Sequence, residues 1–157
     1  MTLKYTEAEV TFAEVPNEVT LCINISNCPN RCKGCHSPHL WEDIGEPLDL
    51  MHLTDLIDSS IGITCVCIMG GDADPIEVDD IAASIKEYYP GLKVAWYSGN
   101  DTISKDIAFW NFDYIKIGSY KEDLGPLNCK ATNQKFFKVV NGEELIDITD
   151  KFWKHEN

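Results

Sequence analysis

Three cysteines, Cys28, Cys32 and Cys35, fall close together in the pattern Cys-x-x-x-Cys-x-x-Cys. They follow an apolar run at 19–25 that predicts a strand, and the polar, turn-forming residues between them place the thiols on a loop. A structural zinc site uses four protein ligands, and an ordinary iron–sulfur cluster uses four thiolates. Three thiolates therefore predict a metal site with one open coordination position, where chemistry can take place.

A closed zinc site is the alternative for these thiols, with Cys22 or His36 as the fourth ligand. A disulfide framework is disfavoured, because the first ten residues are polar and acidic rather than signal-like and the cysteine count of 7 is odd. We therefore expect a cytoplasmic chain with reduced thiols. No apolar run approaches the roughly 18 to 20 residues that a membrane span requires, so no membrane partner is expected.

The size and charge of the chain limit its organisation and its partners. A length of 157 residues predicts a single domain, 1–157, with its own core. The formal net charge of −13 argues against a nucleic-acid partner, since such binding depends on lysine and arginine contacts with phosphates.

Apolar runs alternate with helical periodicities along the chain. Strands are expected at 19–25, 63–69, 94–97, 113–117 and 135–140, and helices at 50–57, 76–89 and 103–109. This alternation predicts an α/β fold with a parallel sheet. The units are too few for a closed eight-stranded barrel, so we expect a partial, open (β/α) barrel with about four to five parallel strands.

Unusual residues follow the expected strands at the ends where ligands bind in parallel α/β sheets. Besides the three cysteines they are Gly70, Gly71, Asp72, Ser98, Gly99, Lys116 and Gly118. Residues at the same ends of neighbouring strands converge on one face. This convergence indicates an enzyme, because a closed zinc knuckle would need no special residues on the other strands.

With these residues in place, the chain resembles the radical S-adenosylmethionine (SAM) superfamily, whose hallmark is Cys-x-x-x-Cys-x-x-Cys after the first strand. The resemblance implies a 4Fe-4S cluster held by Cys28, Cys32 and Cys35, with SAM at the open iron. The segment 70–72 looks like the superfamily's Gly-Gly-Glu/Asp motif, which holds the methionine end of SAM. Glycine lets a ligand approach the backbone closely, and an acidic side chain can accept from an ammonium group.

Within the superfamily, the chain is most similar to the activating enzymes of glycyl-radical enzymes, and among them to that of anaerobic (class III) ribonucleotide reductase. Segments 34–41, 94–99, 113–118 and 132–134 carry this likeness. It implies that an electron from a low-potential donor cleaves SAM reductively, and that the resulting radical takes a hydrogen from a backbone glycine of the partner reductase. The cofactors carry the hard chemistry, and the protein supplies orientation.

The resemblance also implies which residues contact SAM. They are Gly34, His36, Gly70, Gly71 and Asp72, with Ser98 and Lys116 as further candidates for its ribose or carboxylate. The chain departs from the family pattern by inserting Ala73-Asp74 before Pro75, which leaves Asp72 and Asp74 as alternatives for the ammonium partner. Ser37 replaces the usual asparagine, and the N-terminal segment lacks the usual Gly-Pro-Gly-x-Arg opening, so another radical SAM enzyme acting on a small molecule or peptide remains an alternative.

The remaining cysteines have a simpler expectation. Cys22, Cys65 and Cys67 lie within expected strands, where buried free cysteine is an ordinary small core residue. Cys129 is expected on a loop, and nothing near it in the sequence indicates a role.

Overall fold

The computed structural model describes residues 3–30, 32 and 38–153 of the chain. These residues form one mixed sheet of eight strands, two α-helices and three short 3-10 helices. The strands are β1 (Lys4–Thr11), β2 (Thr20–Ile25), β3 (Glu46–Pro47), β4 (Cys65–Met69), β5 (Lys93–Tyr97), β6 (Tyr114–Ile117), β7 (Lys135–Val140) and β8 (Glu144–Asp147). The helices are α1 (Leu50–Asp58), α2 (Pro75–Tyr88), η1 (Pro38–Trp41), η2 (Phe109–Asn111) and η3 (Thr149–Phe152).

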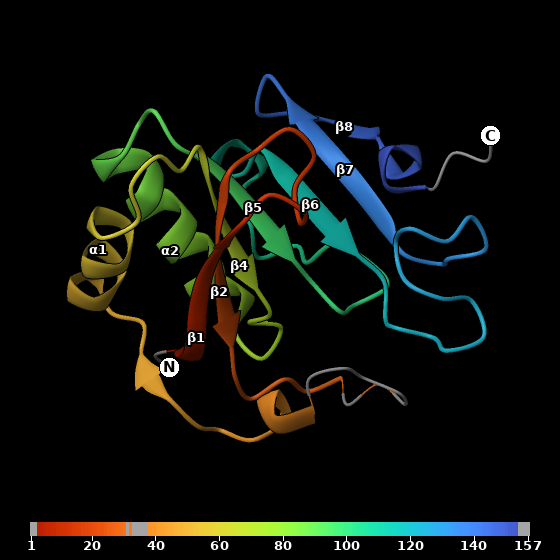
Figure 1. Cartoon of the computed structure of the whole chain (residues 1–157), viewed down its shortest axis with the longest axis horizontal. Helices are drawn as coiled ribbons and strands as arrows, with labels where there is room; N and C mark the ends of the chain where they lie inside the picture. The colour runs from red at the N-terminus through yellow and green to blue at the C-terminus, as the bar shows by residue number, and fades with distance from the viewer. Residues whose placement is uncertain (1–2, 31, 33–37, 154–157) are drawn as a thin grey trace.

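Four parallel strands form the middle of the sheet (Figure 1). In the strand order β3-β1-β2-β4-β5-β6-β7-β8, the pairs β2–β4, β4–β5 and β5–β6 are parallel, and the outer strands pair antiparallel. The predicted α/β class is confirmed, but no barrel is evident. The described chain forms an open mixed sheet, because antiparallel strands rather than further strand–helix units extend the parallel block at both edges. The predicted strand at 135–140 exists as β7, but it runs antiparallel to β6.

Both α-helices cover the same face of the sheet (Figure 1). Parallel strands that follow one another in sequence, joined by right-handed crossovers, place their helices on one side. Val78, Ile81 and Ile85 of α2 pack there in one core cluster with Ile68 of β4 and Trp96 of β5, all of them buried. This burial of apolar side chains is the main force that fixes the strand ends relative to each other.

The two α-helices begin where the sequence supplies a cap. Asp49 accepts a hydrogen bond from the backbone N–H of His52 at the start of α1, and Asp74 accepts from the N–H of Glu77 at the start of α2, where Pro75 follows it. The helices predicted at 50–57 and 76–89 are confirmed to within a residue. No helix in the described part of the chain is both long enough and apolar enough to cross a membrane.

The helix predicted at 103–109 is wrong. That segment is irregular up to the 3-10 turn η2. Asp79 of α2 explains the difference, because its Oδ1 accepts hydrogen bonds from the Ala108 N–H at 2.8 Å and from Asn111 Nδ2 at 3.0 Å. The apolar side chains of Ile103 and Ile107 still pack against the core, but they do so from a loop that the Asp79 hydrogen bonds hold in place.

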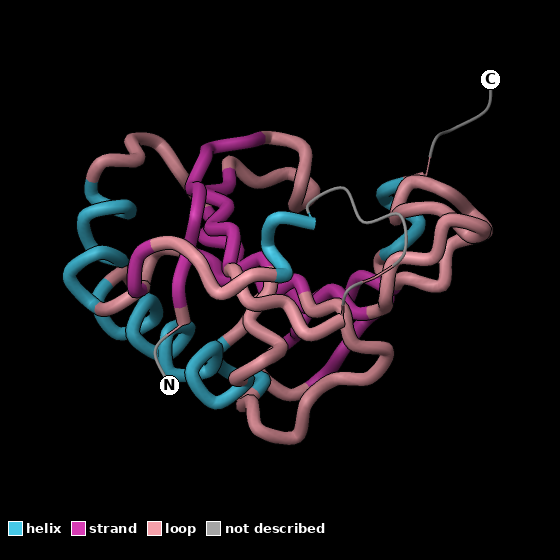
Figure 2. Tube along the Cα trace, turned by 90° about the horizontal axis from the view of Figure 1, so that it is seen from below, coloured by secondary structure: helices cyan, strands magenta, loops and turns pink. Residues whose placement is uncertain are grey.

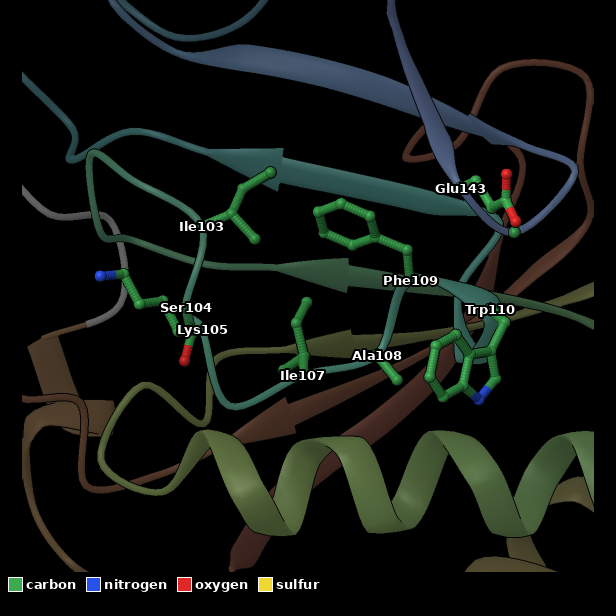
Figure 3. A pocket seen from close by; sticks show the side chains of 9 residues that line it. Ile103, Ser104, Lys105, Ile107, Ala108, Phe109, Trp110 and Glu143 are labelled. Carbon is green, nitrogen blue, oxygen red and sulfur yellow. The ribbon is translucent and has the colours of Figure 1, made fainter.

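The opposite face of the sheet has its own apolar cluster. Cys22, Cys65, Cys67 and Phe136 pack there, and Val15 from the β1–β2 connection is fully buried with them. This face is therefore covered by loops and by the short helix η3, whose Phe152 packs against the cluster, rather than by an α-helix. Figure 2 shows α1 and α2 on one side of the strands.

Candidate functional site at the C-terminal ends of the parallel strands

The C-terminal ends of the four parallel strands meet at one edge of the sheet, which points downward in Figure 1 and toward the viewer in Figure 2. The described candidate residues lie there in order: Cys28 and Cys32 after β2, Gly70 to Asp72 after β4, Ser98 after β5, and Lys116 within β6. Gly34, Cys35 and His36 were also predicted here, and they lie outside the described residues.

The Asp72 carboxylate connects three of these segments. Its Oδ1 accepts a hydrogen bond from Ser98 Oγ at 2.5 Å. Its Oδ2 accepts from the Gly99 N–H at 2.7 Å and from Asn30 Nδ2 at 3.0 Å. Hydrogen bonds to an ionised carboxylate are roughly twice as strong as neutral ones. Asp72 therefore ties the end of β4 to the end of β5 and to the loop that carries the cysteines.

Lys116 adds a partly buried positive charge that interacts with this carboxylate. Its Nζ donates long hydrogen bonds to Ser98 O at 3.4 Å and to Gly118 O at 3.3 Å. Burial lowers the pKa of Lys116, while the negative charges of Asp72 and then Cys32 act in the opposite direction. The site thus combines a carboxylate and an ammonium group that interact electrostatically with each other and with a cysteine of the loop.

Backbone hydrogen bonds close the base of the cysteine loop. The Cys28 N–H donates to Leu40 O at 2.8 Å, and the Asn27 N–H donates to Glu42 O at 2.9 Å. Cys28 and Cys32 are free thiols of intermediate exposure. Because Cys35 is not described, the complete three-cysteine set is not seen. Within residues 3–30, 32 and 38–153, no group of three His, Cys, Asp or Glu side chains is arranged to hold a metal ion.

Gly70 and Gly71 follow β4 in a conformation that favours glycine. Both have positive φ angles, 111° and 94°. A Cβ on Gly71 would lie 2.5 Å from Val78 Cγ2 and 3.3 Å from Leu3 Cδ1, and one on Gly70 would lie 3.2 Å from Ile25 O. The protein's own core occupies the space above both residues. Backbone conformation and packing therefore both favour glycine at these two positions.

The structure separates the two alternative acidic residues. Asp74 caps α2, and its backbone N–H donates to Gly71 O at 3.0 Å, so it belongs to the start of the helix. Asp72 instead bonds to the cysteine loop and to the end of β5. Of the two, Asp72 is the carboxylate at the edge where the candidate residues converge.

The buried cysteines are confirmed as core residues. Cys22, Cys65 and Cys67 are at most 2% exposed. Burial raises the pKa of Cys65 to about 12 and raises the pKa of Cys67 well above its usual value. Cys22 also lies within β2, directly opposite Cys67 in the register, rather than on the loop with Cys28.

Sequence reasoning missed three residues of the site. Asn30 lies in the cysteine loop and bonds to Asp72, although it was treated as a turn residue. Glu14 and Tyr97 line a cavity of about 380 Å³ that also includes Lys116. The Tyr97 hydroxyl donates to the Glu14 carbonyl, and burial raises the pKa of the Glu14 carboxyl. Tyr97 could have been found from its place at the end of a strand, but Glu14 has no such signal.

Comparison of the chain with protein-family models, curated proteins and solved structures finds no match. Any functional conclusion therefore depends on the motif spacing and on the geometry described above.

Proposed function

We propose that the chain is a radical SAM enzyme in which Cys28, Cys32 and Cys35 hold a 4Fe-4S cluster. The observation that carries the proposal is the Asn30–Asp72 hydrogen bond, which ties the cysteine loop to the strand ends where Ser98 and Lys116 also lie. The cysteine motif and an ammonium–carboxylate pair are thereby brought to the same edge of one sheet.

The described residues fit the two cofactors. Cys28 and Cys32 are free and partly exposed, whereas the cysteines of the sheet are buried. A carboxylate has about four acceptor sites, and the Asp72 carboxylate accepts three hydrogen bonds, so it retains capacity for an ammonium group. The Lys116 ammonium has three donors and only two long bonds to carbonyls, so it can donate to a carboxylate. Together these charges match the amino and carboxylate groups of a methionine moiety.

The chain's own residues bind and orient in this proposal. Asp72 and Lys116 hold the amino-acid end of SAM, and the closed base of the cysteine loop keeps Cys28 next to the strand ends. When bound, the cluster and SAM together supply one-electron reductive cleavage and a carbon-centred radical.

We further propose that the substrate is a backbone glycine of anaerobic ribonucleotide reductase, and that a low-potential donor supplies the electron. The sequence resemblance is the main support. The open sheet agrees with it, since the parallel block is not closed into a barrel around the site. The four parallel strands follow one another in chain order, as the strands of a partial (β/α) barrel do.

The metal is tested by anaerobic reconstitution with iron and sulfide. Cys28→Ser, Cys32→Ser and Cys35→Ser should each lose bound iron and the reductive cleavage of SAM, because one iron loses its anchor. Cys22→Ala is the matched control and should keep both, since Cys22 is a core residue. If Cys22→Ala loses metal as completely as Cys32→Ser, the site uses four protein ligands and the proposal fails.

The substrate is tested by electron paramagnetic resonance after anaerobic mixing of the reconstituted chain with the reductase, SAM and a reductant. The expected signal is a doublet that collapses when the reductase contains α-deuterated glycine. If the reductase stays silent while the chain cleaves SAM with a small molecule or peptide, the radical SAM assignment stands and the activating function is refuted.

A further inference from the structure

A second cavity lies at the opposite end of the parallel strands from the candidate site. Its volume is about 240 Å³, and it is lined by Pro16, Asn17, Glu18, Lys93, Tyr114, Lys138, Ile148 and Lys151. Lys93 begins β5 and Tyr114 begins β6, so the cavity is at the N-terminal ends of these strands. We call it the lysine cavity.

The strand register places the cations of the lysine cavity on one face of the sheet. Tyr114 is paired with Ala95 of β5 on one side and with Lys138 of β7 on the other. Lys93 lies two residues before Ala95 and so shares its face, because side chains alternate along a strand. Lys93 and Lys138 therefore lie on either side of Tyr114, and Lys151 reaches the same cavity from η3.

The carboxylate in this cavity is already satisfied by the protein. Glu18 is buried, and its Oε1 accepts from Lys93 Nζ at 2.6 Å and from the Tyr114 hydroxyl at 3.2 Å. Its Oε2 accepts from Thr64 Oγ1 at 2.5 Å. Burial favours the neutral acid, but these hydrogen bonds outweigh burial and the pKa of Glu18 is lowered. Glu18 therefore neutralises the charge of Lys93.

Two positive charges remain without compensation. Neither Lys138 nor Lys151 forms an ion pair or a side-chain hydrogen bond within the described part of the chain. Lys138 and Lys151 differ from other unpaired lysines in that they line one cavity together with Lys93. Like charges on one face of a sheet repel each other, so an anion in the lysine cavity would relieve that repulsion.

We propose that the lysine cavity binds the phosphate group of a small phosphorylated molecule. The two uncompensated lysines match the charge of about −2 that a phosphate monoester carries at neutral pH. The side-chain amide of Asn17 can donate to phosphate oxygens, and Pro16 and Ile148 offer apolar contacts to the rest of the molecule. This site is independent of the proposed radical chemistry, since it lies at the other end of the strands.

The test measures the binding of inorganic phosphate by calorimetry and by the shift in unfolding temperature at constant ionic strength, with chloride as the reference anion. The double variant Lys138→Gln/Lys151→Gln should weaken phosphate binding by about tenfold or more. Both side chains are exposed, so the variant should keep its fold.

The matched control removes the same two charges elsewhere. Lys105→Gln/Lys130→Gln alters two exposed lysines outside the lysine cavity and should change the phosphate affinity by less than about twofold. Binding of glycerol 3-phosphate more tightly than inorganic phosphate would support a phosphorylated small molecule as the natural ligand. Equal loss of affinity in the two double variants, or no binding of either anion by the unaltered chain, would overturn the proposal.

Discussion

Gly71 provides the sharpest test of how the candidate site is built. Its φ angle of 94° is one that residues with a Cβ avoid, and a Cβ at this position would lie 2.5 Å from Val78 Cγ2. The left-handed conformation costs about 1–2 kcal/mol for a residue other than glycine. Overpacking of a core costs about 1–3 kcal/mol more. Gly71→Ala should therefore lower the free energy of unfolding by about 2–5 kcal/mol, the sum of these two costs.

Gly62→Ala is the matched control for the backbone contribution. Gly62 has a φ angle of 83°, and a Cβ there would meet no atom within 4 Å. Its substitution should cost the conformational part alone, about 1–2 kcal/mol. The effect of a Gly→Ala change on the unfolded chain is similar at both positions and cancels in the comparison.

Urea unfolding followed by circular dichroism measures both variants, and Val78→Ala completes a double-mutant cycle. Removing Val78 Cγ2 should relieve the clash, so the cycle should give a favourable coupling of about 1–3 kcal/mol between the two changes. In a domain of this size, Gly71→Ala alone should lower the unfolding temperature by about 4–20 °C. If Gly71→Ala is no more destabilising than Gly62→Ala, the core does not fill the space above Gly71, and the packing argument is refuted.

Three further predictions concern other parts of the molecule. Asp72→Ala should lower the free energy of unfolding in urea by about 3 kcal/mol, because it leaves the Ser98 and Gly99 donors without their acceptor. Asp123→Ala, at an exposed position, should lower it little. Equal losses would refute the role of Asp72 in connecting the strand ends. Glu18→Gln should lower the free energy of unfolding at neutral pH. The difference in this free energy between the variant and the unaltered chain should shrink as pH falls below about 4.3, because the pKa of Glu18 is lowered in the folded state and the stability it gives is lost on protonation. A difference that does not change with pH would contradict this. Alkylation of the native, metal-free protein at mildly alkaline pH should label Cys129 but not the buried Cys65, whose pKa is raised to about 12. Mass spectrometry measures the labelling, and equal rates at the two cysteines would disprove the burial of Cys65.

The parallel block was predictable because its strands and helices carry strong local signals. The run at 63–69 is apolar throughout, and the segment 76–89 has helical periodicity followed by Pro90-Gly91. Each pattern arises because the strand or helix is buried within or against the sheet, so it can be recognised without knowledge of distant contacts. Chain order alone then places the candidate residues at one edge of a parallel sheet.

The outer strands were not predictable in the same way. β1 carries Glu7 and Glu9 and is only partly buried, and β8 is mostly exposed, so neither shows a clear apolar pattern. Each pairs antiparallel with its neighbour along the chain, β1 with β2 and β8 with β7. The direction of β7 could not be predicted either, because an apolar run has the same pattern in parallel and antiparallel pairing.

The residues of the segment 70–72 differ in what they do in the structure. The two glycines before Asp72 serve the fold, since they let the chain turn under Val78 at the start of α2. Asp72 does not cap the helix, and its carboxylate instead accepts hydrogen bonds from Gly99 after β5 and from Asn30 of the cysteine loop. The inserted Asp74 supplies that cap and frees Asp72 for the lateral contacts. The two neighbouring acidic residues thus have different structural roles, since Asp72 ties strand ends together and Asp74 caps a helix.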